Sequence, residues 1–129
     1  MKKIYVMGNL LIEQDSLPIK ILPELRKALP KHEFIELDPS ENFPKQTSLT
    51  IIDTVLDIKE VKLIKNIDKI QLQNVCSLHD FDLGYNLKLM KKFGLVKKVN
   101  IIGVPYNIEE KEAVKQIKEV ITNLFSRNE

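Results

Sequence analysis

The sequence is poor in the residues that disulfide-stapled domains and phosphate-binding loops need. It has one cysteine, Cys76, and only four glycines among 129 residues. A single cysteine excludes an internal disulfide and a cysteine-based zinc site, and it fits a reducing cytoplasm. Cys76 could be a nucleophile, but such residues are more often buried as small hydrophobes. We therefore expect a cytoplasmic protein that folds on its own hydrophobic core, as one domain over residues 1–129.

Arginine and long apolar runs are also scarce. Lysine outnumbers arginine by 18 to 2, and 20 basic residues oppose 18 acidic ones for a net charge of +2. Arginine is the better bidentate ligand for phosphate, and no basic segment separates from the acidic residues. No apolar run approaches the roughly 18 residues of a membrane span. We therefore expect neither a nucleic acid nor a membrane as a partner.

Aliphatic residues are abundant, and their spacing predicts an α/β protein. Isoleucine, leucine and valine make up 42 of the 129 residues. Apolar alternation or short apolar runs predict strands, and apolar residues three or four apart predict helices. Because strands alternate with helices, we expect a mostly parallel twisted sheet with helices on both faces. The expected strands are 2–7, 33–38, 49–53 and 99–104, with weaker candidates at 61–64 and 70–72; the expected helices are 17–28, 83–93 and one opening at 107–110.

Several residues predict where helices begin or bend. Ser16 is a candidate N-cap for the first helix, and Pro23 should kink that helix or delay its start. Asn107 and Glu110 have the spacing of a capping box for the last helix. His32 falls in a polar stretch, so we expect a solvated loop residue.

Polar residues cluster at three places that share one edge of the expected fold: the ends of two strands and the segment before the helix expected at 83–93. Ligands of open α/β sheets bind beyond the carboxyl ends of the strands. Two carboxylates and one imidazole there would suit a borderline divalent metal such as nickel or zinc, with positions left for substrate or water. Taken singly, each residue has a plainer interpretation: a helix cap for Asp15, a turn for Asp53, and a surface or capping residue for His79. The cluster comprises Gly8, Asn9, Asp15, Asp53, Ser77, His79 and Asp80.

Common catalytic and nucleotide-binding motifs do not occur in the chain. The turn after the first strand has one glycine where a dinucleotide fingerprint needs three. Neither a Walker A sequence, nor a G-x-S-x-G elbow, nor an H-E-x-x-H pair is present.

Four segments together resemble the hydrogenase maturation endopeptidases. Residues 7–15 read MGNLLIEQD, similar to the family's G-N-x-L-x-x-D-[DE] after a first strand. Residues 51–55 (IIDTV) resemble its apolar strand ending in Asp-Ala. Residues 77–80 (SLHD) resemble its S-x-H segment, and residues 99–105 (VNIIGVP) resemble its last strand. The order agrees with the family, so the resemblance extends over nearly the whole chain.

This resemblance implies a function and a set of residue roles. Members of the family remove a C-terminal peptide from the large-subunit precursor of nickel-iron hydrogenase after nickel insertion. The implied metal contacts are Asp15, Asp53 and His79, and the nickel is that of the substrate, with another divalent metal as the alternative. The implied substrate contacts are Gly8, Asn9, Asp38 and Ser40. No general base is assigned.

The chain also departs from the family pattern. Val6 stands where the family's first glycine is usual, and Gln14 replaces an acidic residue. Residues 38–44 (DPSENFP) have no glycine, whereas the family has a Gly-rich loop there for substrate recognition. These departures leave two alternatives open: a non-catalytic relative that binds a metal-loaded partner, and an unrelated α/β binding module.

Overall fold

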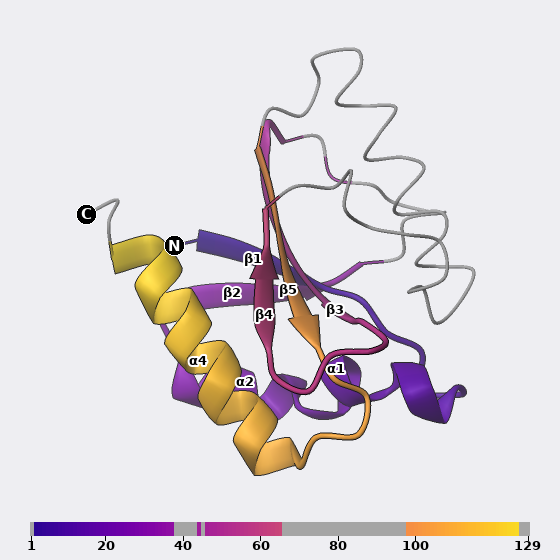
Figure 1. Ribbon diagram of the computed structural model, residues 1–129. Coiled ribbons are helices and arrows are strands. Elements are labelled where there is room, and N and C mark those ends of the chain that lie inside the picture. Colours follow the sequence, from indigo (N-terminus) through magenta and orange to yellow (C-terminus); the bar gives the residue numbers. More distant parts are fainter. Residues whose placement is uncertain (1, 38–43, 45, 66–97, 127–129) are drawn as a thin grey trace.

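A five-stranded sheet forms the centre of the computed structural model, which describes residues 2–37, 44, 46–65 and 98–126 (Figure 1). The strand order is β2-β1-β3-β5-β4. All neighbours pair in parallel except β4, which runs antiparallel to β5 at the edge. The strands are β1 (Lys2–Val6), β2 (His32–Glu36), β3 (Ser48–Thr54), β4 (Lys62–Ile64) and β5 (Lys98–Val104). The predicted mostly parallel sheet is confirmed.

The two longest strands lie at the middle of the sheet. In both β3 and β5 only the first residue is exposed and the following six are buried. Strands that are covered on both faces need apolar residues at every position, which the runs around Ile51 and Ile101 provide. β4 is short and only half-buried, as expected of an edge strand.

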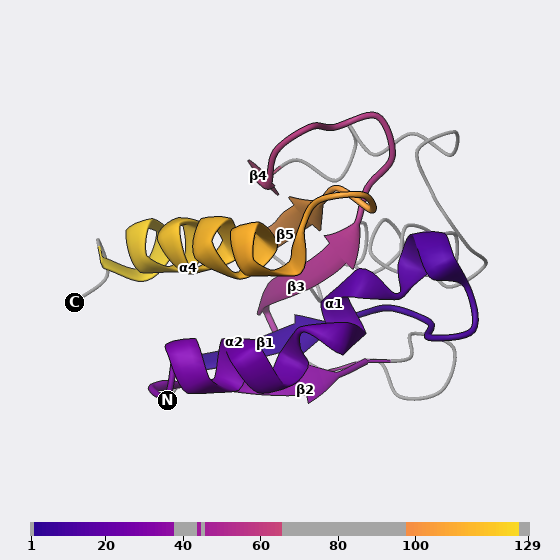
Figure 2. The same cartoon turned by 90° about the horizontal axis from the view of Figure 1, so that it is seen from below.

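Three helical segments pack on one face of the sheet (Figure 2). They are α1 (Leu17–Lys20), α2 (Leu22–Ala28) and α4 (Glu110–Ser126), and α2 contacts α4 directly. The core on this face includes Ile4, Val6, Leu22, Leu25, Phe34, Ile52, Ile102, Ile117 and Ile121. The opposite face has a second buried cluster, with Tyr5, Met7, Leu49, Ile51, Val99 and Ile101 among its members. The helix predicted at 83–93 and the strand predicted at 70–72 lie outside the described residues.

Helix ends and one loop assignment differ from the sequence predictions. Pro23 does interrupt the first helix, because the chain breaks into α1 and α2 at Ile21. Ser16 occupies the N-cap position of α1 but makes no capping bond; its hydroxyl donates to the carbonyl of Glu13 instead. The predicted capping box at 107–110 is wrong, since α4 begins only at Glu110.

His32 is a strand residue and not a solvated loop residue. It opens β2, and its ring lies 5.3 Å from the ring of Phe125, centroid to centroid. Phe125 belongs to the last turn of α4, so the contact joins two elements that are far apart in sequence. Charged residues, Lys31 and Glu33, stand on both sides of His32, so the local pattern indicated a polar segment and not a contact with Phe125.

Ile117 offers a direct test of this packing. Its side chain is fully buried between α4 and the sheet. We expect Ile117→Ala to lower the free energy of unfolding by about 2–5 kcal/mol, because it removes apolar contacts and leaves a cavity. The neighbouring exposed residue gives a control, Lys118→Ala, which should change stability by less than about 0.5 kcal/mol. Equal midpoints for the two variants in urea unfolding would show that α4 does not pack as described.

No described helix is long and apolar enough to cross a membrane.

Candidate metal and substrate site

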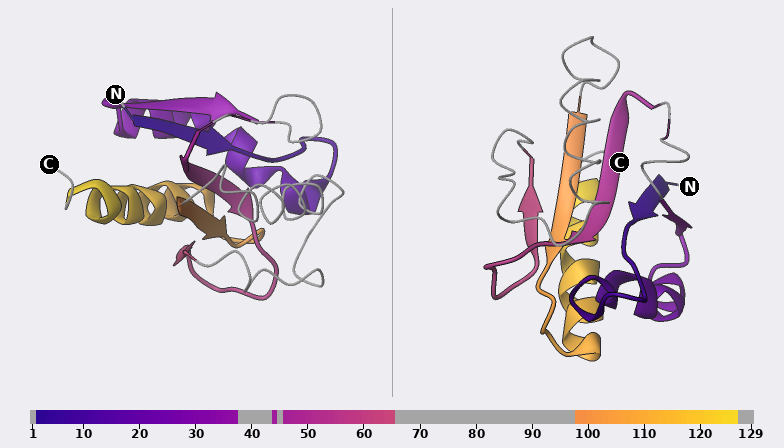
Figure 3. Two further views of the ribbon diagram at one scale, coloured as in Figure 1. Left: turned by 90° about the horizontal axis from the view of Figure 1, so that it is seen from above. Right: turned by 90° about the vertical axis from the view of Figure 1, so that its right-hand side faces the viewer.

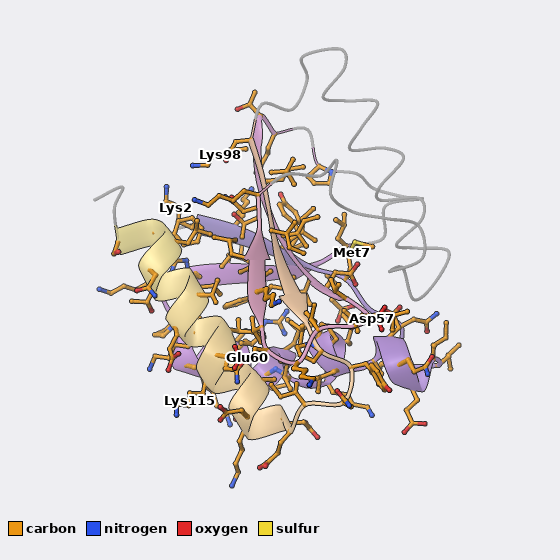
Figure 4. The ribbon with its side chains drawn as sticks, viewed as in Figure 1. Lys2, Met7, Asp57, Glu60, Lys98 and Lys115 are labelled. Carbon is orange, nitrogen blue, oxygen red and sulfur yellow. The ribbon has the colours of Figure 1, made fainter. Side chains whose placement is uncertain are left out.

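The strand order places a switch point of the chain between the carboxyl ends of β1 and β3. β1 pairs with β2 on one side and with β3 on the other, so the connections that follow β1 and β3 leave in different directions (Figure 3). In open parallel sheets such a switch point is where ligands bind, beyond the carboxyl ends of the strands. Figure 4 marks this edge by Met7 and Asp57, opposite Lys2 and Lys98 at the starts of β1 and β5.

A tightly closed loop follows β1. The backbone N–H of Asn9 donates to the carbonyl of Asp15 across 2.8 Å, and the N–H of Ile12 donates to the carbonyl of Asn9. The side-chain Oδ1 of Asn9 accepts a hydrogen bond from the N–H of Leu11 at 2.9 Å. Asn9 therefore uses its backbone and its side chain to hold a loop that returns to its own start.

Asp15 lies at the far end of this loop and is fully buried. It is the last residue of a 3-10 turn, η1 (Glu13–Asp15), which contacts β3. Its N–H donates to the carbonyl of Ile12. The alternative that Asp15 caps the first helix is not supported, because Ser16 occupies that position.

Gly8 allows the loop to close. A Cβ at this position would lie 2.8 Å from the backbone oxygen of Asp15 and 2.8 Å from Cγ1 of Ile19. Both distances are well inside van der Waals contact, and one of the two atoms belongs to the backbone. The glycine of the first motif is therefore needed for the close approach that positions Asp15.

Asp53 lies near the end of the central strand β3. Its side chain is 5% exposed, and its Oδ1 accepts a hydrogen bond from the N–H of Thr54 at 2.8 Å. The turn that follows β3 comes later, at Leu56 and Asp57, so Asp53 is a strand residue and not the residue that closes a turn. Its partner across the sheet is Gly103 of β5.

Gly103 of β5, which the sequence pattern indicated only as part of the last strand, also belongs to this edge. A Cβ there would lie 2.9 Å from Cγ2 of Val55. A glycine within an apolar strand is a known sign of close approach, and this signal was available from the sequence. It lets the chain after β3 lie close against β5.

The structure brings two of the three predicted metal-binding residues to the same edge of the sheet. Asp15 follows β1, Asp53 lies near the end of the neighbouring strand β3, and both residues are buried. Within the described ranges, no group of three His, Cys, Asp or Glu side chains is close enough to hold a metal ion. The third predicted ligand, His79, lies outside the described residues, as do Asp38, Ser40, Cys76, Ser77 and Asp80.

Carboxylate oxygens at this edge suit a divalent cation. Buried ionised carboxylates are stable only when they are hydrogen-bonded, paired with a charge or bound to a metal. Two carboxylates fit a borderline ion such as nickel or zinc when an imidazole completes the donor set.

Comparison with solved structures identifies the same fold elsewhere. The hydrogenase maturating endopeptidase HybD from E. coli superposes with a TM-score of 0.67 over 99% of this chain and 94% of its own, at 14% sequence identity. The [NiFe] hydrogenase maturation protease HybD from Thermococcus kodakarensis gives 0.64 over 96% and 99%, at 18% identity. A hydrogenase 3 maturation protease gives 0.60 over 92% and 88%, also at 18% identity.

Sequence comparisons add no relative: no family model and no curated protein matches the chain. The structural likeness spans almost the full length of both partners in each case. It confirms the fold that the sequence resemblance implied. This chain has the fold of the hydrogenase maturation endopeptidases.

Proposed function

We propose that the protein is an endopeptidase of hydrogenase maturation. It removes the C-terminal peptide from the large-subunit precursor of a nickel-iron hydrogenase after nickel insertion, in the cytoplasm. The observation that supports this most is the pair of buried carboxylates, Asp15 and Asp53, at the switch point of a fold that solved maturation proteases share.

The residues of this edge suggest how the chain would recognise a loaded precursor. Asp15 and Asp53 provide oxygen donors from two neighbouring strands, and His79 would provide a nitrogen donor. Both carboxylates sit on backbone that is already hydrogen-bonded, so little ordering is needed on binding. The nickel of the substrate, when bound there, would polarise the scissile carbonyl or a water molecule.

Other residues would hold the polypeptide of the precursor. Gly8 and Asn9 form the start of the loop after β1, near the carboxylates. There the backbone of these two residues can contact an extended segment of the substrate. Asp38 and Ser40 follow β2, and we propose that they contact the substrate from that side. The sequence 38–44 has no glycine, so we expect its preference among precursors to differ from that of members with a Gly-rich loop.

The direct test is cleavage of a nickel-loaded precursor. We expect that incubation with the protein lowers the intact mass of the large subunit by the mass of one short C-terminal peptide. A precursor of unchanged mass, with the protein folded and in excess, would contradict the proposal.

The altered segment 38–44 favours a second candidate, a relative that binds a metal-loaded precursor without cutting it. The same incubation discriminates the two. A complex that survives gel filtration while the precursor keeps its full mass would favour the binding protein. A shortened precursor would exclude it.

His79→Ala tests the third donor of the proposed site. We expect a variant that folds normally by circular dichroism and has lost cleavage by a factor of about 100 or more, since one of three protein ligands is removed. The control is His32→Ala, which removes the other histidine of the chain at the start of β2, at the end of the sheet away from Asp15 and Asp53. Full cleavage by His79→Ala would show that this histidine is not a ligand.

A further inference from the structure

Exposed apolar side chains are concentrated at one edge of the protein. Among the described residues, four large hydrophobic side chains are more than a third exposed: Leu10 (59%), Leu11 (93%), Ile12 (37%) and Tyr106 (43%). The first three follow β1, and Tyr106 follows β5. All four therefore lie beyond the carboxyl ends of parallel strands, at the edge that holds Asp15 and Asp53. Exposed apolar side chains grouped in this way are typical of interaction surfaces.

The loop that presents Leu10, Leu11 and Ile12 is held in place. Its backbone is closed by the bonds from Asn9 to Asp15, from Ile12 to Asn9 and from Leu11 to the Asn9 side chain. The N–H of Leu11 donates a hydrogen bond to Oδ1 of Asn9, which holds the backbone at this position, and the side chain of Leu11 is 93% exposed. An apolar side chain that is held in water by an ordered backbone needs little reorganisation to bind a partner.

The two apolar groups flank the central strand from both sides. β3, which ends at Asp53 and Thr54, lies between β1 and β5. Neighbouring strands are about 4.8 Å apart, so the ends of β1 and β5 are separated by about 10 Å, and an extended peptide spans that distance with about three residues. A peptide crossing the edge would contact the loop after β1, pass the end of β3 and reach the loop after β5.

Charge at this edge favours a polypeptide over a lipid surface. Glu13 is exposed directly after Ile12, and the two candidate ligands are also carboxylates. An anionic membrane surface would be repelled there, because peripheral membrane binding needs basic residues around the apolar ones. An apolar peptide segment has no such conflict.

We propose that Leu10, Leu11, Ile12 and Tyr106 form the docking surface for an extended apolar segment of the protein substrate, next to the bond to be cut. This inference rests on the proposed function. It adds the chemistry of the segment recognised and the residues that recognise it.

The test is the kinetics of precursor cleavage by Leu11→Ser. Leu11 is almost fully exposed, so the substitution should leave the thermal unfolding midpoint unchanged. We expect KM for the nickel-loaded precursor to rise about tenfold or more with kcat little changed, because only binding area is removed. Leu11→Met retains apolar area and should recover most of the affinity.

Two controls separate the possible outcomes. Lys118→Ser, on the exposed face of α4, should behave as the unsubstituted protein. If the unsubstituted protein cleaves the precursor and Leu11→Ser has an unchanged KM, the docking surface is wrong while the proposed function stands. If the unsubstituted protein cleaves no precursor, the proposed function fails. The docking surface is then tested by measuring the binding of a synthetic peptide with the precursor's C-terminal sequence. Equal affinities of the unsubstituted protein and Leu11→Ser for this peptide would overturn the docking surface.

Discussion

Asp53→Asn should lower the rate of precursor cleavage by about 100-fold or more without unfolding the protein. Asparagine has the size of aspartate, and its Oδ1 can still accept the hydrogen bond from the N–H of Thr54. It cannot supply the negative charge that a divalent ion requires, and metal polarisation of a reacting carbonyl or water contributes several kcal/mol. The loss should therefore appear in the rate and not in the unfolding transition.

A matched control lies four residues further along the chain. Asp57 follows the same strand and is exposed, with a φ of 65°. Asparagine tolerates that backbone conformation as well as aspartate does, so Asp57→Asn makes the same chemical change without strain. We expect nearly normal cleavage by Asp57→Asn. An equal loss of cleavage rate in both variants would indicate a general effect of charge at this edge. Normal cleavage by Asp53→Asn would exclude Asp53 as a metal ligand.

Gly8→Ala should reduce both stability and cleavage. The new Cβ would fall 2.8 Å from the Asp15 carbonyl oxygen and 2.8 Å from Cγ1 of Ile19, so the loop after β1 must shift. Overpacking of this kind typically costs about 1–3 kcal/mol of unfolding free energy. The shift would move Asp15, whose carbonyl accepts the hydrogen bond from the N–H of Asn9. We therefore also expect the rate of cleavage to fall by about tenfold or more.

A double variant distinguishes the two parts of this effect. Gly8→Ala with Ile19→Ala removes the side-chain clash but keeps the contact with the Asp15 backbone. We expect Ile19→Ala to lower the free energy of unfolding in urea by less when it is added to Gly8→Ala than when it is made in the unsubstituted protein. The rate of cleavage should stay low in the double variant. Recovery of full cleavage by the double variant would show that the position of Asp15 does not depend on Gly8.

The central strands and the last helix were predictable because their signals are local. Apolar runs at 49–53 and 99–104 correspond to β3 and β5 within two residues at each end. The last helix buries Ile117 and Ile121, which are four residues apart, in the core cluster that includes residues of the sheet. The predictions for Ser16, His32 and Asn107 were wrong for one shared reason. The role of each residue depends on where a neighbouring element ends or on a contact across the fold, and the spacing of nearby residues specifies neither.

The candidate site was predictable to a similar extent. Parallel strands bring their carboxyl ends to one edge, and this places Asp15, which follows β1, and Asp53, near the end of β3, at the same edge. The closure of the loop at 9–15 could not be foreseen, since it depends on the approach of Gly8 to Ile19 in the following helix. The exposure of Leu11 could not be predicted either, because a run of apolar residues next to a strand is equally typical of the buried core.

Comparing nickel-loaded with nickel-free precursor tests the central claim most directly. Both forms of a hydrogenase large subunit are incubated with the protein, and their intact masses are followed over time. We predict loss of a short C-terminal peptide from the loaded form alone, because the proposed site of Asp15, Asp53 and His79 would recognise the substrate's own metal. Equal shortening of both forms, or none of the loaded form, would contradict that recognition.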